Sequence, residues 1–325
     1  MPSREERLRA AIAGEAVDRP PVALWRHFPG DDQDPEDLAA AVLSFQQQFD
    51  FDFIKVTPAS SYSVRDWGSV DIWRGNTEGT GEYLHYPVQT PDDWAALPVL
   101  DPTRGSLGGQ LECLHLIGNA TGGHTPFLPT IFNPLAQAKN LAGSANLIEH
   151  LRGSPDALHA GLETITQTTI RFVEEAVGAG VSGIFLALQH ASRRLLSTGE
   201  YREFGEPYDR RVLEAARGLW LNIVHLHGEA VMFDLVAEYP AVALNWHDRE
   251  EGPSLAEGKE RFRGAVCGGW RREDTLVRGS PEQIRREAED AFAQTGGRRL
   301  ILGAGCVTPI IAPWRNLQAA RQATG

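Results

Sequence analysis

The stretch LNIVHLHGEAVMFDLVAEYPAVALNWHD (residues 221–248) contains two short apolar runs, LNIVHLH (221–227) and AVALNW (241–246). Nearly continuous apolarity over a few residues is typical of a strand that is buried on both faces of a parallel sheet. Further runs of this kind predict six more strands, at PVALW (21–25), FDFIKV (51–56), PFLPTIF (126–132), SGIFLAL (182–188), GAVCGG (264–269) and RLILGAG (299–305).

Helical patterns separate these runs, at residues 34–49, 154–180, 197–218, 280–297 and 313–323. Ser154 and Ser280 are N-cap candidates, and glycines follow the ends of both of their helices. Eight strands alternating with helices predict an α/β fold, a single (β/α)8 TIM barrel over residues 1–325. The alternative is a doubly wound open sheet, but the glycine-rich loop that usually follows its first strand is missing. Residues 57–124, after the second strand, are predicted to be a long insertion that forms a lid or a pocket wall.

The composition excludes several classes of protein. Asp and Glu number 43 against 31 Lys and Arg, a formal net charge of −12, so a broad basic surface for nucleic acid is not expected. Three scattered cysteines do not make a disulfide framework and fit a reducing cytoplasm. The sequence has no apolar signal-peptide core and no apolar window long enough for a membrane span. We therefore expect a cytoplasmic protein whose partner is a small molecule.

Polar residues gather at the predicted carboxyl ends of the strands, where the active sites of barrel enzymes lie. In chain order they are Arg26 and His27, Lys55, Gln189 and His190, His225 and His227, Asn245, Trp246 and His247, Arg271, and Cys306. This clustering predicts a catalytic site built on Gln189, His190, His225, His227 and Cys306, with the remaining residues and Arg193 binding the substrate.

His225 and His227 stand two apart, so on a strand they point the same way and their tilted rings can converge on one ion. With Cys306 they supply three ligands for Zn²⁺ and leave a fourth position open. The alternative is a pair of hydrogen-bonded pocket histidines without metal. Cys306 is a candidate ligand, a candidate nucleophile, or a small buried residue.

The other candidates carry alternatives of their own. Arg193 and Arg271, each within an arginine pair, suit an anionic ligand or a surface ion pair. Trp246 suits the wall of a flat ligand or simple packing. Lys55 lies in an apolar strand, so we expect it to meet Asp50, Asp52 or the anion of a ligand.

Taken in order, several of these segments resemble the uroporphyrinogen decarboxylase superfamily. They are DRPPVALWRHFPG, FDFIKVTP, PTIFNPLAQAKNL, LSTGEYREFGEPYDRRV, HLHGE and GCVTPIIAPWRNLQAA. The resemblance covers nearly the whole chain and implies a (β/α)8 barrel. A homodimer is also expected from it.

The superfamily has two chemical branches. The decarboxylases act on tetrapyrrole acetate arms without a cofactor; here only Arg26 matches their first Arg, Ala304 replaces their late His, and Asp52 is out of register. For the corrinoid-dependent methyltransferases, the resemblance implies a zinc site of the pattern H-x-C…C. In this chain His225 matches the first ligand, His227 replaces the middle Cys and Cys306 matches the last.

The first hypothesis is therefore methyl or other one-carbon transfer with a thiol or a corrinoid, with Zn²⁺ on His225, His227 and Cys306. Arg26, His27 and Lys55 would orient a small anionic substrate, and a corrinoid protein is a possible partner. The alternative is a cofactor-free decarboxylase of a tetrapyrrole or another polycarboxylate, anchored by Arg26, Arg193 and Arg271. A third hypothesis is a non-catalytic barrel that binds a corrinoid or porphyrin.

Overall fold

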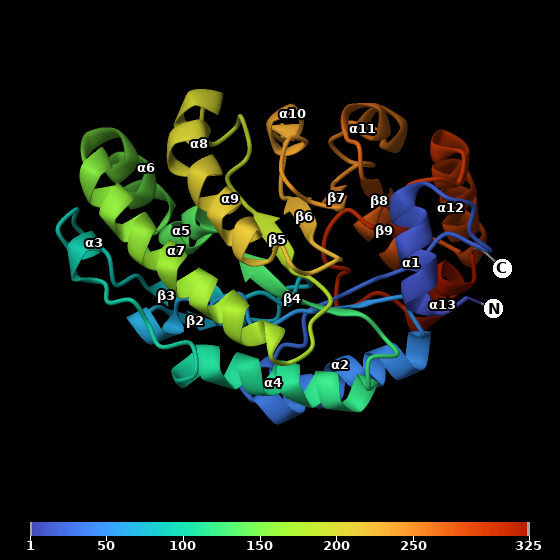
Figure 1. Cartoon of the computed structure of the whole chain (residues 1–325), viewed down its shortest axis with the longest axis horizontal. Coiled ribbons are helices and arrows are strands. Elements are labelled where there is room, and N and C mark those ends of the chain that lie inside the picture. Colours follow the sequence, from blue (N-terminus) through green and yellow to red (C-terminus); the bar gives the residue numbers. More distant parts are fainter. Residues whose placement is uncertain (1, 324–325) are drawn as a thin grey trace.

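The computed structural model describes residues 2–323. A curled parallel sheet of seven strands lies at its centre, and the helices surround it (Figure 1). In spatial order the strands are β1 (Ile54–Val56), β4 (Phe127–Phe132), β5 (Phe185–Leu188), β6 (Ile223–Leu226), β7 (Ala243–Trp246), β8 (Ala265–Trp270) and β9 (Leu300–Ala304). Every residue of these strands is buried, which explains their continuous apolarity. The architecture is α/β and consistent with a TIM-like barrel.

The parallel register brings the polar strand ends to one edge of the sheet. His225 on β6 is level with Ala187 on β5 and Asn245 on β7. The residues that follow His225 and Asn245 by two positions, His227 and His247, therefore leave the sheet beside each other. This edge carries the site described below.

The predicted strand at residues 21–25 is wrong as a regular strand. Val22 forms only an isolated parallel bridge with Leu302 of β9, and its carbonyl accepts from the Asp52 backbone N–H before β1 at 2.9 Å. Pro20 and Pro21 have no N–H to donate, and the N–H of Val22 is taken by the Asp52 carboxylate at 2.7 Å. The segment thus touches both edges of the sheet without forming a ladder.

The helices are α1 (Arg4–Ala13), α2 (Pro35–Phe49), α3 (Asp93–Ala96), α4 (Gly105–Thr121), α5 (Pro134–Ala142), α6 (Ser144–Gly153), α7 (Pro155–Val177), α8 (Thr198–Phe204), α9 (Glu206–Ala215), α10 (Phe233–Val236), α11 (Leu255–Arg261), α12 (Pro281–Thr295) and α13 (Trp314–Gln322). Four of the five predicted helices, those at 34–49, 154–180, 280–297 and 313–323, are confirmed as α2, α7, α12 and α13, with shorter ends. Ser280 accepts from the N–H of Gln283 and so caps α12 as expected.

The predicted helix at 197–218 is instead two helices, α8 and α9, which meet at Gly205. A Cβ on Gly205 would lie 2.6 Å from the Tyr201 ring. The Tyr201 ring lies against Gly205, and its hydroxyl donates a 2.6 Å hydrogen bond to the buried Asp209 carboxylate. The break therefore admits a buried polar contact that an unbroken amphipathic pattern does not reveal.

Residues 57–124 hold the antiparallel hairpin of β2 (Val70–Ile72) and β3 (Glu82–His85), together with α3 and α4. Figure 1 places α4 beside α2 on one flank of the sheet, while the hairpin lies near α5. None of the helices within residues 2–323 combines the length and apolarity needed to cross a membrane.

Candidate metal centre and its cavity

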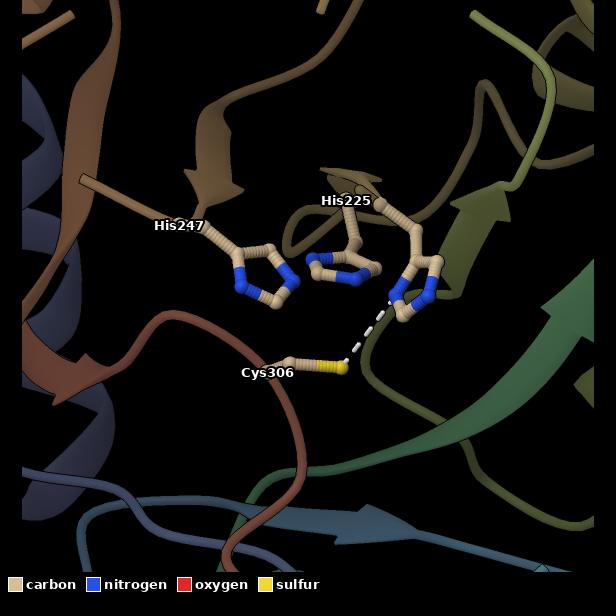
Figure 2. Close-up of side chains that lie close together, drawn as sticks. His225, His247 and Cys306 are labelled. Carbon is tan, nitrogen blue, oxygen red and sulfur yellow. Dashed lines mark hydrogen bonds between the residues drawn. The ribbon is translucent and has the colours of Figure 1, made fainter. Parts of the chain in front are cut away.

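Four side chains meet at the carboxyl edge of the sheet: His225, His227, His247 and Cys306. One nitrogen of each histidine and the cysteine sulfur all lie within 4.8 Å of one another. Figure 2 shows the rings of His225 and His247 and the sulfur of Cys306 turned toward a common centre. The sulfur is 3.6 Å from Nδ1 of His227. The structure thus brings together the three predicted ligands and adds His247, which the sequence analysis placed among the substrate-binding residues.

Gly305 allows the close approach that places Cys306 in this cluster. A Cβ at position 305 would lie 2.8 Å from Cα of His247 and 3.0 Å from the carbonyl oxygen of Trp246. Only a residue without a side chain lets the chain after β9 pass so near the chain after β7. Cys306 follows directly and faces the three imidazoles.

Asn245 fixes the orientation of His225 from beneath the cluster. Its Nδ2 donates to the carbonyl oxygens of Cys267 at 2.8 Å and Ala304 at 2.9 Å, so its Oδ1 is the atom that faces Nδ1 of His225 at 2.7 Å. His225 must therefore carry its proton on Nδ1, and its Nε2 presents a lone pair. Asn245 is not among the residues that line the cavity over the cluster, which is described below, and it acts as a positioning residue.

Two buried nitrogens of the cluster, Nε2 of His225 and Nε2 of His247, find no hydrogen-bond partner among residues 2–323. A buried polar atom without a partner costs about 1–3 kcal/mol, so native proteins rarely leave two of them side by side. A metal ion held by these nitrogens, by His227 and by the cysteine sulfur would satisfy both. Three imidazoles and one thiolate are ligands that Zn²⁺ accepts, so the residues fit the metal that the sequence predicts.

The cluster also favours a thiolate at Cys306. Burial by itself would raise the pKa of the Cys306 thiol. The neighbouring imidazoles of His225, His227 and His247 outweigh this effect and bring the pKa well below its usual value. Burial alone would lower the pKa of His227, yet its contact with Cys306 raises that pKa above the ordinary value. A thiolate is the form of cysteine that ligates metals and acts as a nucleophile.

A cavity of about 330 Å³ opens over the cluster. Six residues predicted for the site line it: His27, Lys55, Gln189, His225, His227 and Cys306. The lining residues that were not predicted include Glu78, Tyr83, Lys139 and Asn140. Glu78 and Tyr83 come from the segment 57–124, so this part of the predicted insertion does contribute to the pocket wall.

Lys55 does not meet the carboxylates expected for it. Asp52 is bound by Arg7 at 2.9 Å and Arg19 at 2.7 Å, and Asp50 pairs with Arg4 and Arg321 at the surface. The Lys55 ammonium instead donates to Thr57 Oγ1 at 3.1 Å and lies 4.9 Å from the Phe185 ring centre. Burial lowers its pKa to about 7, although the negative charge of Cys306 opposes that shift. Lys55 therefore faces the cavity without an ionised partner.

His27 lies close by and is uncharged near neutral pH. Burial lowers its pKa to about 4, and the charge of Lys55 adds to the shift. Its Nδ1 is 3.2 Å from the carbonyl oxygen of Pro58. His27 thus lines the cavity as a neutral imidazole.

Several predicted substrate-binding residues are not among those that line the cavity. Arg26 contacts the Ile310 carbonyl oxygen, Arg193 the Val231 carbonyl oxygen and Arg271 the Glu287 carboxylate, at 3.1, 3.2 and 2.7 Å respectively. The three arginines expected to anchor a polycarboxylate therefore do not converge on the cavity.

Trp246 and His190 also lie outside the lining. Trp246 is fully buried, donates from Nε1 to the Pro253 carbonyl oxygen at 2.7 Å and packs on Phe233. Its role in this position is packing. His190 is buried with Nδ1 unpartnered, and burial, together with the charges of Lys139 and His227, lowers its pKa to about 3.

Comparisons with known proteins bear on the family and the fold of the chain. A sequence model of the family described as uroporphyrinogen decarboxylase (URO-D) matches residues 3–324. Uroporphyrinogen decarboxylase of Xanthomonas axonopodis pv. citri is 25% identical over 327 residues, covering 90% of this chain and 89% of the relative. The protein of the same name from Saccharopolyspora erythraea is 33% identical over 148 residues, covering 42% of this chain and only 38% of the relative. The solved structure of a methyltransferase from Methanosarcina mazei superposes with a TM-score of 0.88 at 21% identity, covering 99% of this chain and 98% of the other.

Proposed function

The chain belongs to the uroporphyrinogen decarboxylase family, and within that family we propose that it is a zinc-dependent methyl (one-carbon) transferase acting with a thiol or a corrinoid. The observation that carries the proposal is the cluster of His225, His227, His247 and Cys306 at the floor of the cavity. A cofactor-free decarboxylase has no need for three imidazoles and a thiolate gathered within 4.8 Å, two of them with buried, unpartnered nitrogens.

His225, His227, His247 and Cys306 would hold the ion, and one of the imidazoles would give way when a substrate thiol binds, because a zinc site with four protein ligands is otherwise closed. When bound, Zn²⁺ lowers the pKa of a thiol and leaves the sulfur nucleophilic. Three neutral imidazoles and one thiolate leave a divalent ion with one net positive charge, which is complementary to a substrate thiolate. Replacement of the middle cysteine by His227 therefore keeps the site a metal site but makes it more positive.

The surrounding residues have separate tasks in this proposal. Asn245 holds the lone pair of His225 Nε2 toward the centre, through the 2.7 Å contact to Nδ1. Lys55 and the neutral His27 face the cavity and would orient an anionic substrate. Gln189 offers an uncharged amide at the same wall. Glu78 is held by an ion pair with Arg272, so its charge does not oppose an anion.

The methyl donor or acceptor on the other side of the reaction is proposed to be a corrinoid, free or carried by a partner protein. The fold neighbour named a methyltransferase supports this branch of the family. The finer architecture is proposed to be a (β/α)8 barrel in one domain, with the Val22 segment as the eighth position. A homodimer in solution is part of the same proposal.

The test has two readouts. Metal analysis of protein purified without added zinc should find about one Zn²⁺ per chain. The same protein, incubated with methylcobalamin and a small thiol, should form the methyl thioether, followed by mass spectrometry and by the visible spectrum of the corrinoid. Protein that holds no zinc, even after addition of the ion, contradicts the proposal, as does metal-loaded protein that binds no thiol at the metal.

Decarboxylation is the second candidate, because the curated relatives that align along the chain are named uroporphyrinogen decarboxylase. Against it, Arg26, Arg193 and Arg271 do not line the cavity, and Asp52 is engaged by two arginines elsewhere. Incubation with uroporphyrinogen and measurement of released CO₂ tests this candidate directly. Loss of acetate carboxyl groups at a rate that does not depend on metal would favour it over methyl transfer.

A further inference from the structure

The chain contains only three lysines, at positions 55, 139 and 259, against 28 arginines. Two of the three, Lys55 and Lys139, line the same cavity. Within residues 2–323, neither of these ammonium groups lies within 4.0 Å of a carboxylate. Four arginines with little exposure do have such a partner, namely Arg7, Arg19, Arg249 and Arg272. A charge facing a cavity in this way lacks the partner that proteins normally provide.

Lys139 is on α5, two turns after the end of β4, and lies on a part of the wall to which β3 and α5 both contribute. Its ammonium is 5.7 Å from the centre of the Tyr83 ring on β3. The next residue, Asn140, is 2% exposed, lines the cavity, and has a side-chain oxygen without any hydrogen-bond partner. That oxygen can only accept, so it calls for a hydroxyl or N–H donor on the ligand, whereas the Lys139 ammonium beside it calls for an acidic group.

Lys55 occupies a different part of the wall, on β1. It lies against the rings of Trp25 and Phe185 and is close enough to feel the negative charge of Cys306. The lysines therefore do not duplicate each other: one is beside the His–Cys cluster and the other is beside the unpartnered amide of Asn140. The carboxylate that lines this cavity, Glu78, is already paired with Arg272 and neutralises neither.

We propose that Lys139, on the wall shared with Tyr83, binds an acidic group of the substrate, and that Lys55 binds a second acidic group nearer the His–Cys cluster. The substrate class is then a small molecule with two acidic groups. Resting on the proposed function, this molecule is a thiol that carries both groups, for example on the pattern of mercaptosuccinate.

Charge balance leads to the same class. The thiolate of the substrate offsets the one positive charge left at the proposed metal centre, and the two lysines remain for two further negative charges. A lysine ammonium serves carboxylate, sulfonate or phosphate as a compact point charge, without the planar two-point geometry of arginine. The two lysines therefore select for the number of negative charges on the substrate, and not for carboxylate, sulfonate or phosphate in particular.

The first experiment uses three thiols on Co²⁺-loaded protein: 2-mercaptoethanol, mercaptoacetate and mercaptosuccinate. Affinity is read from the increase in sulfur-to-cobalt absorption above the band that Cys306 itself gives, and this increase does not depend on turnover. Mercaptosuccinate should bind about 10-fold more tightly than mercaptoacetate, because it adds one charge-assisted contact. Lys139→Met should abolish that preference. Lys259→Met, which removes the remaining lysine of the chain, on α11, should retain it. Equal affinity for the two acids in the unchanged protein, or a preference that survives Lys139→Met, overturns the proposal.

The second experiment separates the subsite from the metal chemistry. Succinate, which has no thiol, is titrated into metal-free protein by calorimetry, and propionate serves as the one-acid control. Binding of succinate that Lys139→Met weakens by about 10-fold, in protein that never transfers methyl groups, retains the subsite and rejects the proposed function. Methyl transfer to mercaptoacetate, without any preference for succinate or mercaptosuccinate, rejects the subsite and retains the function. Thermal melting of each variant confirms that it is folded.

Discussion

Substitution of Asn245 by alanine should weaken metal binding although Asn245 is not a ligand. The side chain accepts the Nδ1 proton of His225 at 2.7 Å and so fixes which nitrogen is free to bind. Loss of an outer contact of this kind costs about 10- to 100-fold in metal affinity, or about 1.4–2.7 kcal/mol. The unsupported imidazole can then rotate or place its proton on Nε2, and in that tautomer it cannot ligate.

The same substitution also destabilises the fold, and the two effects must be separated. Nδ2 of Asn245 donates to the carbonyl oxygens of Cys267 and Ala304, and each loses its donor at a cost of about 1–3 kcal/mol. Asn222 offers a matched control at the opposite end of β6. It is also buried, it donates to the carbonyl of Ala216 at 2.8 Å and it accepts from the N–H of Ile184 at 3.0 Å. Asn222→Ala should therefore lower stability to a comparable extent and leave metal affinity unchanged.

Metal affinity is measured by competition with a chromophoric chelator for Zn²⁺, and stability by urea unfolding of the metal-free proteins. The expected result is a 10- to 100-fold loss of affinity in Asn245→Ala only. The reasoning is refuted if Asn245→Ala binds zinc as tightly as the unchanged protein, or if Asn222→Ala weakens zinc binding equally. The second result would mean that loss of stability alone explains the effect.

Three further predictions concern the thiolate, the packing and a buried acid. Cys306→Ser should reduce zinc affinity by at least about 100-fold and eliminate the sulfur-to-cobalt absorption band, whereas Cys113→Ser, in α4, should change neither. Gly258→Ala should cost about 1–3 kcal/mol in urea unfolding, because its Cβ would lie 2.5 Å from a buried tryptophan ring; Gly109→Ala has open space and should be neutral or stabilising, and equal effects would contradict the packing argument. Burial raises the pKa of Asp209 from 3.8 to about 6, so the folded state binds its proton more tightly than the unfolded chain does. Stability should therefore fall by about 3 kcal/mol as pH rises from 4 to 7, and Asp209→Asn should remove that part of the pH dependence; an unchanged profile in the variant would reject the assignment.

Apolar runs located most of the sheet in advance because a strand buried on both faces needs little else from its sequence. The runs at 51–56, 126–132, 182–188, 221–227, 241–246 and 299–305 each contain one observed strand, and the run at 264–269 contains all but the last residue of β8. The run at 21–25 is equally apolar, but its neighbouring prolines and the reach of the Asp52 carboxylate to Val22 remove the N–H groups that a ladder requires. That contact spans 30 residues of chain, so no local pattern contains it.

The cluster was partly predictable for a related reason. A spacing of two at a strand end identified His225 and His227, whereas Asn245 and His247, which stand the same two apart at the next strand end, were assigned to substrate binding. Only the register, which places His225 opposite Asn245, decides that the asparagine supports the first histidine and that His247 joins the cluster. The identity of the fourth ligand is therefore a property of strand pairing and not of either motif alone.

The arginines and lysines of this chain show where charge patterns mislead. Arg193 and Arg271 follow strands and so resemble anchors for an anion, yet a carbonyl and a carboxylate of the protein already occupy them. A long guanidinium finds such partners within its own reach, and its position in the sequence does not show which one it takes. Rarity is a better signal here, since the chain has three lysines in 325 residues and two of them line one cavity. Lys139 was missed because it lies inside a helix rather than at a strand end, and its proposed role depends on its place on the cavity wall, which only the folded chain reveals.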